Sequence, residues 1–136
     1  MKQTDIPALL LRYGPAALMT ALVPALSLLP ARFFAPIGQP LPPIPAFDKL
    51  VHALLYAALT AAWLRARPPA QRQRLRAALE TALAAAVFGL LLEVAQKTLT
   101  ATRAMDPLDA LANAAGALAC ALAAFALARR RPAPTP

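Results

Sequence analysis

Residues 110–128 read ALANAAGALACALAAFALA, a stretch of nineteen residues without a single charge. It ends at three consecutive arginines, Arg129 to Arg131. A helix that spans a membrane needs about 20 mainly apolar residues, and alanine and leucine are the strongest helix formers among them. The stretch therefore predicts a transmembrane helix over about residues 108–128.

Three further apolar runs precede this one. Residues 13–31 carry no charge but contain Pro15 and Pro24, which should kink a helix. The other two runs have ionisable residues mainly near their ends, where long side chains can reach the headgroups. We predict an all-α polytopic membrane protein, a single membrane domain over residues 1–136, built as a bundle of four transmembrane helices at about 13–31, 48–67, 77–96 and 108–128.

The composition supports a membrane environment and argues against nucleic acid. The chain is 60% hydrophobic and 15% charged, whereas soluble domains average about 45–50% apolar and about 25% charged residues. Its net charge of +8 would suit nucleic acid, but aromatic residues make up only 6% and offer little for base stacking. We expect the lipid bilayer, and not nucleic acid, as the main partner.

The distribution of basic residues predicts the orientation. Ten of the 14 lysines and arginines flank one side of the predicted spans, at the N-terminus, between the second and third helices and at the C-terminus. Cytoplasmic loops of membrane proteins carry an excess of lysine and arginine. We therefore expect a multi-pass protein with both termini in the cytoplasm.

Polar residues cluster at the opposite, outer ends of three predicted helices. Asp48, His52 and Tyr56 are spaced by four residues and share one helix face. Glu93 closes the third helix, and an aspartate-rich segment opens the fourth. The predicted pocket consists of Asp48, Lys49, His52, Tyr56, Glu93, Gln96, Arg103, Asp106, Asp109 and Asn113.

Two interpretations of these residues stay open at this point. In the first they form a structural clasp, in which Asp48 and Asp106 cap helices, Arg103 pairs with a carboxylate and His52 bonds a neighbour. In the second they form a functional pocket, with His52, Glu93 and Asp109 as candidate acid–base residues. Such a set could also bind Mg²⁺, Mn²⁺ or Zn²⁺. Because neither an HExxH motif nor paired CxxC motifs occur, we predict no metal site and no cofactor.

A stripe of small residues also runs along the fourth predicted helix. Its members recur every four positions, which allows a neighbouring helix to approach closely. That neighbour is either another helix of the chain or a second copy, so a homo-oligomer is one expectation. The stripe consists of Ala112, Gly116, Cys120, Ala124 and Ala128.

Three motifs in this order resemble those of the VanZ-like family. The run DKLVHALLY at 48–56 is similar to the opening motif of that family, and EVAQ at 93–96 is similar to its E-x-x-Q element. Arg103 followed by DPLD at 106–109 and NAAG at 113–116 resembles its final block, an arginine before D-x-x-D-x-x-x-N-x-x-G. The three motifs lie on consecutive predicted spans.

The resemblance covers about residues 47–118 and departs from the family at Ala53, where an aromatic residue is frequent. It implies a small protein of the cell envelope in the bacterial inner membrane, from a family named after a protein linked to teicoplanin resistance. The expected function is an outward-facing pocket that binds a lipid-linked cell-wall precursor, a glycopeptide or a related ligand. The alternative is a membrane enzyme that acts on a lipid headgroup or cell-wall precursor by carboxylate and histidine chemistry.

Overall fold

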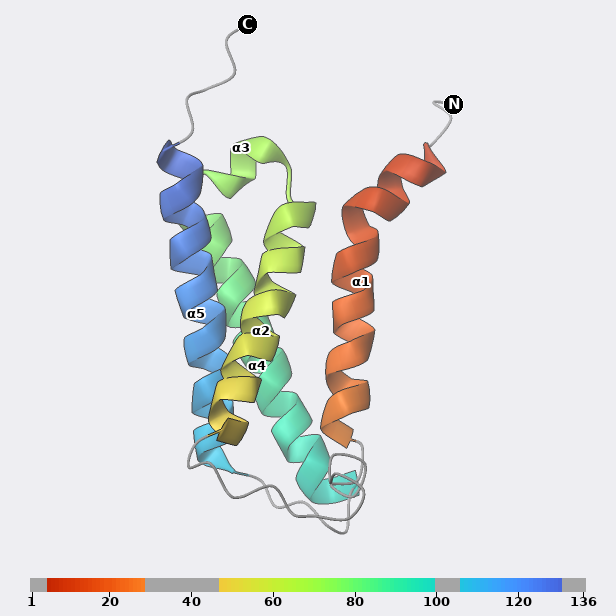
Figure 1. Cartoon of the computed structure of the whole chain (residues 1–136), viewed down its shortest axis with the longest axis vertical. Helices are drawn as coiled ribbons and strands as arrows, with labels where there is room; N and C mark the ends of the chain where they lie inside the picture. Colours follow the sequence, from red (N-terminus) through yellow and green to blue (C-terminus); the bar gives the residue numbers. More distant parts are fainter. Residues whose placement is uncertain (1–4, 29–46, 100–105, 131–136) are drawn as a thin grey trace, which may run out of the picture.

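The computed structural model describes residues 5–28, 47–99 and 106–130, and every element in these ranges is a helix (Figure 1). The predicted all-α class is therefore confirmed. In chain order the helices are α1 (Ile6–Leu28), α2 (Phe47–Ala66), α3 (Pro69–Arg72), α4 (Leu75–Leu99) and α5 (Pro107–Arg130).

Three of these helices, α1, α4 and α5, are long and apolar enough to cross a membrane. Their outer surfaces carry large apolar side chains, among them Leu11, Leu83 and Leu111, which leave more than half of their surface exposed. Contiguous exposed apolar surface of this kind suits lipid rather than water. α2, with 20 residues, is not among these three helices, and its first two turns carry Asp48, Lys49 and His52.

The helix bounds differ from the prediction at several ends. α1 begins at Ile6 rather than at residue 13 and so includes Arg12. The Nε of Arg12 donates a 2.7 Å hydrogen bond to the carbonyl of Ala66, at the end of α2. The predicted last residues of this helix, 29–31, lie outside the described residues. α4 is longer than predicted at both ends, and the short α3 was not predicted.

Proline explains the shape of α1. The first turns of α1 bend away from the rest of the helix (Figure 1), as expected from the prolines inside it, Pro15 and Pro24. A proline within a helix removes one backbone donor and its ring presses on the carbonyl four residues earlier. The predicted kink is confirmed in the first half of the helix.

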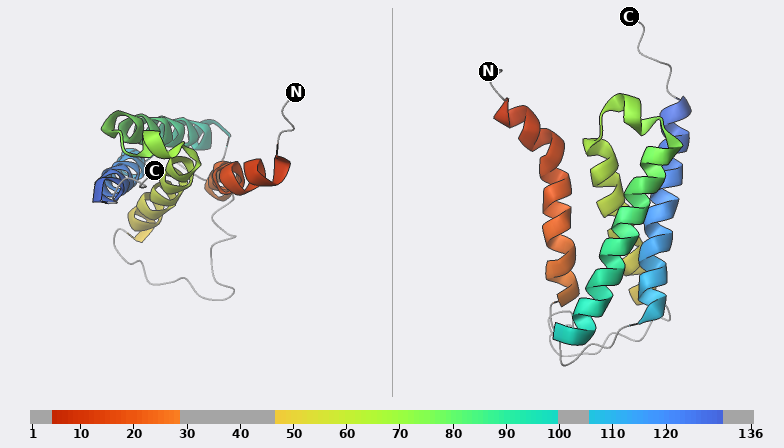
Figure 2. Two further views of the ribbon diagram at one scale, coloured as in Figure 1. Left: turned by 90° about the horizontal axis from the view of Figure 1, so that it is seen from above. Right: turned by 180° about the vertical axis from the view of Figure 1, so that it is seen from behind.

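α2, α4 and α5 form a compact group, and α1 lies along its side, mainly against α2 (Figure 2). The closest approach joins α2 and α5. A Cβ atom placed on Gly116 would lie 2.0 Å from the carbonyl oxygen of Ala53, so only glycine fits there. At Gly116 the stripe of small residues therefore packs inside the chain, which is the first of the two uses considered for it.

The two ends of the bundle differ in chemistry. The starts of α2 and α5 and the end of α4 lie together at one end, which we call the polar end (Figure 1). The start of α1, the end of α2, α3 and the end of α5 lie at the other, which we call the basic end. The polar end holds Asp48, Lys49, His52, Glu93, Lys97, Asp106 and Asp109, and the basic end holds Arg12, Arg65, Arg67, Arg72, Arg74, Arg76, Glu80, Arg129 and Arg130.

Candidate functional site

Lys49 joins two helices at the polar end. Its Nζ donates hydrogen bonds to Asp48 Oδ2 at 2.8 Å, to Asp106 Oδ2 at 2.5 Å and to Asp109 Oδ1 at 2.5 Å. Asp48 belongs to the same helix, whereas Asp106 and Asp109 belong to the start of α5. A single ammonium group therefore holds three carboxylates together and fixes the start of α5 against α2.

The two aspartates expected to cap helices behave differently. Asp106 Oδ1 accepts a 2.8 Å hydrogen bond from the backbone N–H of Leu108, so it caps α5 as predicted. The hydrogen bond from Lys49, followed by the one from Leu108, lowers the pKa of the Asp106 carboxyl below its usual range. Asp48 lies inside the first turn of α2, where its carboxylate accepts hydrogen bonds from the Lys49 ammonium and from the backbone at the start of the helix.

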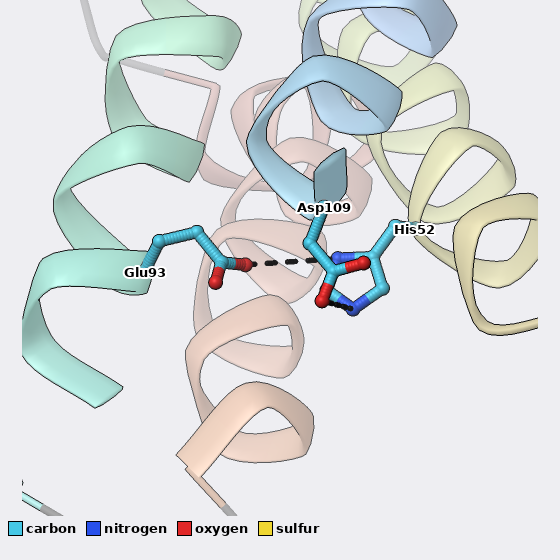
Figure 3. Close-up of side chains that lie close together, drawn as sticks. All are labelled: His52, Glu93 and Asp109. Carbon is cyan, nitrogen blue, oxygen red and sulfur yellow. Dashed lines mark ion pairs between the residues drawn. The ribbon is translucent and has the colours of Figure 1, made fainter. Parts of the chain in front are cut away.

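One turn deeper, His52, Glu93 and Asp109 converge from three different helices (Figure 3). His52 Nδ1 lies 3.8 Å from Glu93 Oε1, and His52 Nε2 lies 3.8 Å from Asp109 Oδ2. One nitrogen or oxygen atom of each residue lies within 4.8 Å of the others. The structure thus brings together the three residues that the sequence suggested as acid–base candidates.

Asn113 fixes the orientation of the imidazole. His52 Nδ1 lies 3.0 Å from Asn113 Oδ1. Because an amide oxygen only accepts hydrogen bonds, Nδ1 must carry the proton and donate it. In the neutral ring Nε2 then has a free lone pair, which points toward the side of Asp109.

Gly89 makes room for this arrangement from α4. A Cβ atom there would lie 2.9 Å from Tyr56 Cε1 and 3.0 Å from Asn113 Nδ2, so a side chain would displace both. Gly89 was not among the predicted site residues. The sequence did offer one indication of its importance, because it is the only glycine in the apolar run 77–96 and lies one helical turn before Glu93.

Glu93 is the most deeply buried charged residue among those described. Only 2% of its surface is exposed, and its Oε2 has no hydrogen-bond partner among the described residues. The hydroxyl of Tyr56, predicted on the same α2 face as His52, is also buried and without a partner there. Burying a charged carboxylate without a partner is costly, so Glu93 needs a proton or a positively charged neighbour at this position.

Gln96, the glutamine of the E-x-x-Q element, connects two helices at the polar end. Its Nε2 donates a 2.7 Å hydrogen bond to the carbonyl of Ser27, near the end of α1. This contact attaches α1 to α4 at the polar end. Arg103, the remaining predicted pocket residue, lies outside the described residues.

The arrangement can do two things chemically. Four carboxylates face one lysine ammonium and one histidine at the polar end, so the cluster favours a positively charged group. A histidine placed between two carboxylates can also transfer a proton. Comparisons of the chain with protein-family models, with curated proteins and with solved structures found no match.

Proposed function

We propose that this chain is a VanZ-like protein of the bacterial inner membrane whose polar end binds a lipid-linked or cell-wall-related ligand. The observation that supports the proposal is the convergence of His52, Glu93 and Asp109 from α2, α4 and α5 at one end of the bundle. Ionisable residues within apolar spanning helices usually face the bundle interior and mark a substrate or ion site. The side chains of His52 and Asp109 keep 19% and 16% of their surface exposed, so a ligand can reach the cluster from the bundle end.

The proposal includes α2 as a fourth membrane span. Its 20 residues correspond to about 30 Å of helix, the thickness of the hydrocarbon core. It packs along α5, so both helices occupy the same depth. Its charged first turn is paired through Lys49 with α5, which lowers the cost of placing these residues at the membrane boundary.

In the proposed orientation the polar end faces away from the cytoplasm. Support comes from the basic end, which carries the arginines at the ends of α2 and α5 and in α3, because basic flanks favour the cytoplasmic side. A C-terminal reporter enzyme that is active only outside the cytoplasm should be inactive. Activity of that fusion would reverse the proposed orientation.

The proposed ligand can be tested by mass spectrometry of the lipids retained through mild purification. We expect the wild type to retain a lipid-linked species that Asp109→Asn loses, because Asp109 contacts both Lys49 and His52. Glu80→Gln is the matched control, since Glu80 is a carboxylate at the basic end. Equal retention by all three folded proteins would reject the ligand pocket.

The proposed link with teicoplanin rests on the resemblance alone and is tested separately. Expression of the chain in a susceptible bacterium should raise the teicoplanin concentration needed to stop growth. His52→Asn should abolish this gain if the cluster carries it. A gain that is identical in the variant would show that the cluster is not involved.

An enzyme is the second candidate, and it is favoured by the position of His52 between two carboxylates at 3.8 Å each. In this version Glu93, His52 and Asp109 supply acid–base chemistry to a lipid headgroup or cell-wall precursor. Incubation with labelled envelope lipids should then yield a product, and Glu93→Gln should remove it. A retained but unchanged lipid favours binding over catalysis.

A further inference from the structure

We propose that His52, Glu93 and Asp109 form a site for a first-row divalent cation such as Zn²⁺ or Mn²⁺. One ligand atom of each residue lies within 4.8 Å of the other two. Ligands at about 2.1 Å from one ion lie about 3–4 Å apart. Asp109 Oδ2 already lies beside Nε2, and the Glu93 carboxylate, which lies on the Nδ1 side of the ring, must turn toward Nε2 to complete the set. The sequence, which lacks the known metal motifs, predicted no such site.

The tautomer of His52 fits a metal ligand. Its Nδ1–H donates to Asn113 Oδ1, which leaves the lone pair of Nε2 free. Histidines that bind metals almost always donate their second N–H to a carboxylate or carbonyl oxygen in this way. Asn113, with 1% of its surface exposed, is held in place by the packing around Gly89.

The lone pair of His52 Nε2 faces a second hydrogen-bond acceptor, the carboxylate of Asp109. Asp109 Oδ2 lies 3.8 Å from Nε2, and neither atom offers a proton to the other in the neutral tautomer. Their mutual repulsion is relieved when a cation binds both. The other oxygen of Asp109 already accepts a bond from Lys49, which fixes the orientation of the carboxylate.

Glu93 supplies an independent indication. Its side chain points toward His52 (Figure 3), is 97% buried and has an Oε2 atom without a hydrogen-bond partner among the described residues. A buried carboxylate requires a proton or a cation. The neighbouring acidic group of Asp48, Asp106 and Asp109 differs in this respect, because the Lys49 ammonium already sits among those oxygens.

One imidazole and two carboxylates are ligands that suit Zn²⁺ and Mn²⁺. Three protein ligands leave coordination positions for a further group, as in metal sites that bind substrates. Such a cation would attract the phosphate of a lipid headgroup, which the acidic cluster alone repels. This inference rests on the proposed ligand pocket for its role, but the metal itself can be measured without any lipid.

The first experiment measures metal content. The full chain in mild detergent is stripped with EDTA, given ZnCl₂ or MnCl₂, desalted and analysed by elemental mass spectrometry. We expect about one ion per wild-type chain and at least a tenfold loss of affinity in Glu93→Gln and Asp109→Asn. Glu80→Gln, which alters a carboxylate at the basic end, should bind like the wild type. Equal binding by wild type and Glu93→Gln would overturn the proposal.

The second experiment needs no substitution in the cluster. His52 is the only histidine of the chain, so selective ¹⁵N labelling gives one imidazole signal pair. Zinc should shift the Nε2 resonance strongly and leave Nδ1 protonated. If both nitrogens carry protons at neutral pH and zinc changes neither, His52 is a positively charged counter-ion and the site is rejected.

The two proposals fail in different ways. Retention of the lipid by EDTA-treated protein that binds no zinc would reject the cation site and keep the ligand pocket. Zinc binding that needs Glu93 and Asp109, with no lipid retained, would keep the cation site and reject the proposed ligand. If the wild type neither binds zinc nor retains a lipid, both proposals are rejected.

Discussion

The polar and basic ends of this bundle use similar charged residues in opposite ways. At the basic end Glu80 pairs with Arg76 at 2.8 Å and with Arg67 at 3.6 Å, and the Arg76 side chain is 90% exposed. At the polar end Glu93 is almost completely buried and Asp109 is shared between Lys49 and His52. Exposed ion pairs add little to stability, whereas buried ones join helices and must be satisfied. The polar end therefore carries the energetic and chemical constraints of the molecule.

The largest expected effect comes from breaking the closest packing near the polar end. Gly116→Val would place a side chain against the backbone of Ala53, which lies 2.0 Å from the nearest added atom. Because the backbone of Ala53 cannot turn aside as a side chain can, α2 and α5 must separate. We expect the free energy of unfolding to fall by several kcal/mol or more and most of the folded protein to be lost. The yield of monodisperse protein in detergent measures this loss. Gly14→Ala, near the basic end, is the control. A Cβ atom at Gly14 would have no neighbouring atom within 4 Å, so this variant should purify normally.

The second comparison removes one cation from each end. Lys49→Met leaves three carboxylates without their shared ammonium, and we expect the midpoint of thermal unfolding to fall by about 5 °C or more. Arg76→Met breaks an exposed pair four residues apart and should shift the midpoint by about 1 °C or less. Equal shifts in the two variants would contradict the contrast between the ends.

A smaller effect is expected where the cluster meets the core. Gly89→Ala forces Tyr56 and Asn113 to move by a few tenths of an ångström, which should cost about 1–2 kcal/mol. The movement also disturbs the bond between Asn113 and His52, so the ¹⁵N signal of His52 Nδ1 should shift. A stability loss without that spectral change would separate packing from the orientation of the imidazole.

The smallest expected effect is on how the stability of the fold depends on pH under acidic conditions. The pKa of the Asp106 carboxyl is lowered by Lys49 and by its helix-capping bond, so its ionised form stabilises the fold. That contribution is present above the unfolded pKa of about 4 and disappears as pH falls through the lower folded value. Asp106→Asn keeps a capping oxygen but removes the charge. We expect its unfolding midpoint to depend less on pH between about 2 and 5 than that of the wild type.

The sequence predicted the depth of the cluster but not its contacts. Hydropathy fixes where a helix enters and leaves the apolar zone, which is why His52, Glu93 and Asp109 were expected at one level and were found together. Hydropathy does not predict how each helix is rotated about its own axis. These helices are apolar on nearly all sides, so the pattern does not say which face meets which neighbour.

Most individual contacts between helices therefore went unpredicted. The bond from Gln96 to the Ser27 carbonyl and the bond from Arg12 to the Ala66 carbonyl both use backbone oxygen atoms, which no side-chain pattern reveals. Because only uncharged residues were counted, the first helix was predicted to begin after Arg12, whereas α1 begins at Ile6. The role of Lys49 was also missed, because its partners Asp106 and Asp109 lie more than fifty residues away.

The close contact between Gly116 and Ala53 also has a mechanical consequence. Since no side chain separates the two backbones, α2 and α5 move as one rigid piece. His52, Asn113 and Asp109 belong to that piece, whereas Glu93 belongs to α4. Three members of the cluster therefore keep fixed positions relative to one another, and the distance to Glu93 depends on how α4 packs against this pair. A spin label on α5 paired with one on α4 would measure that distance.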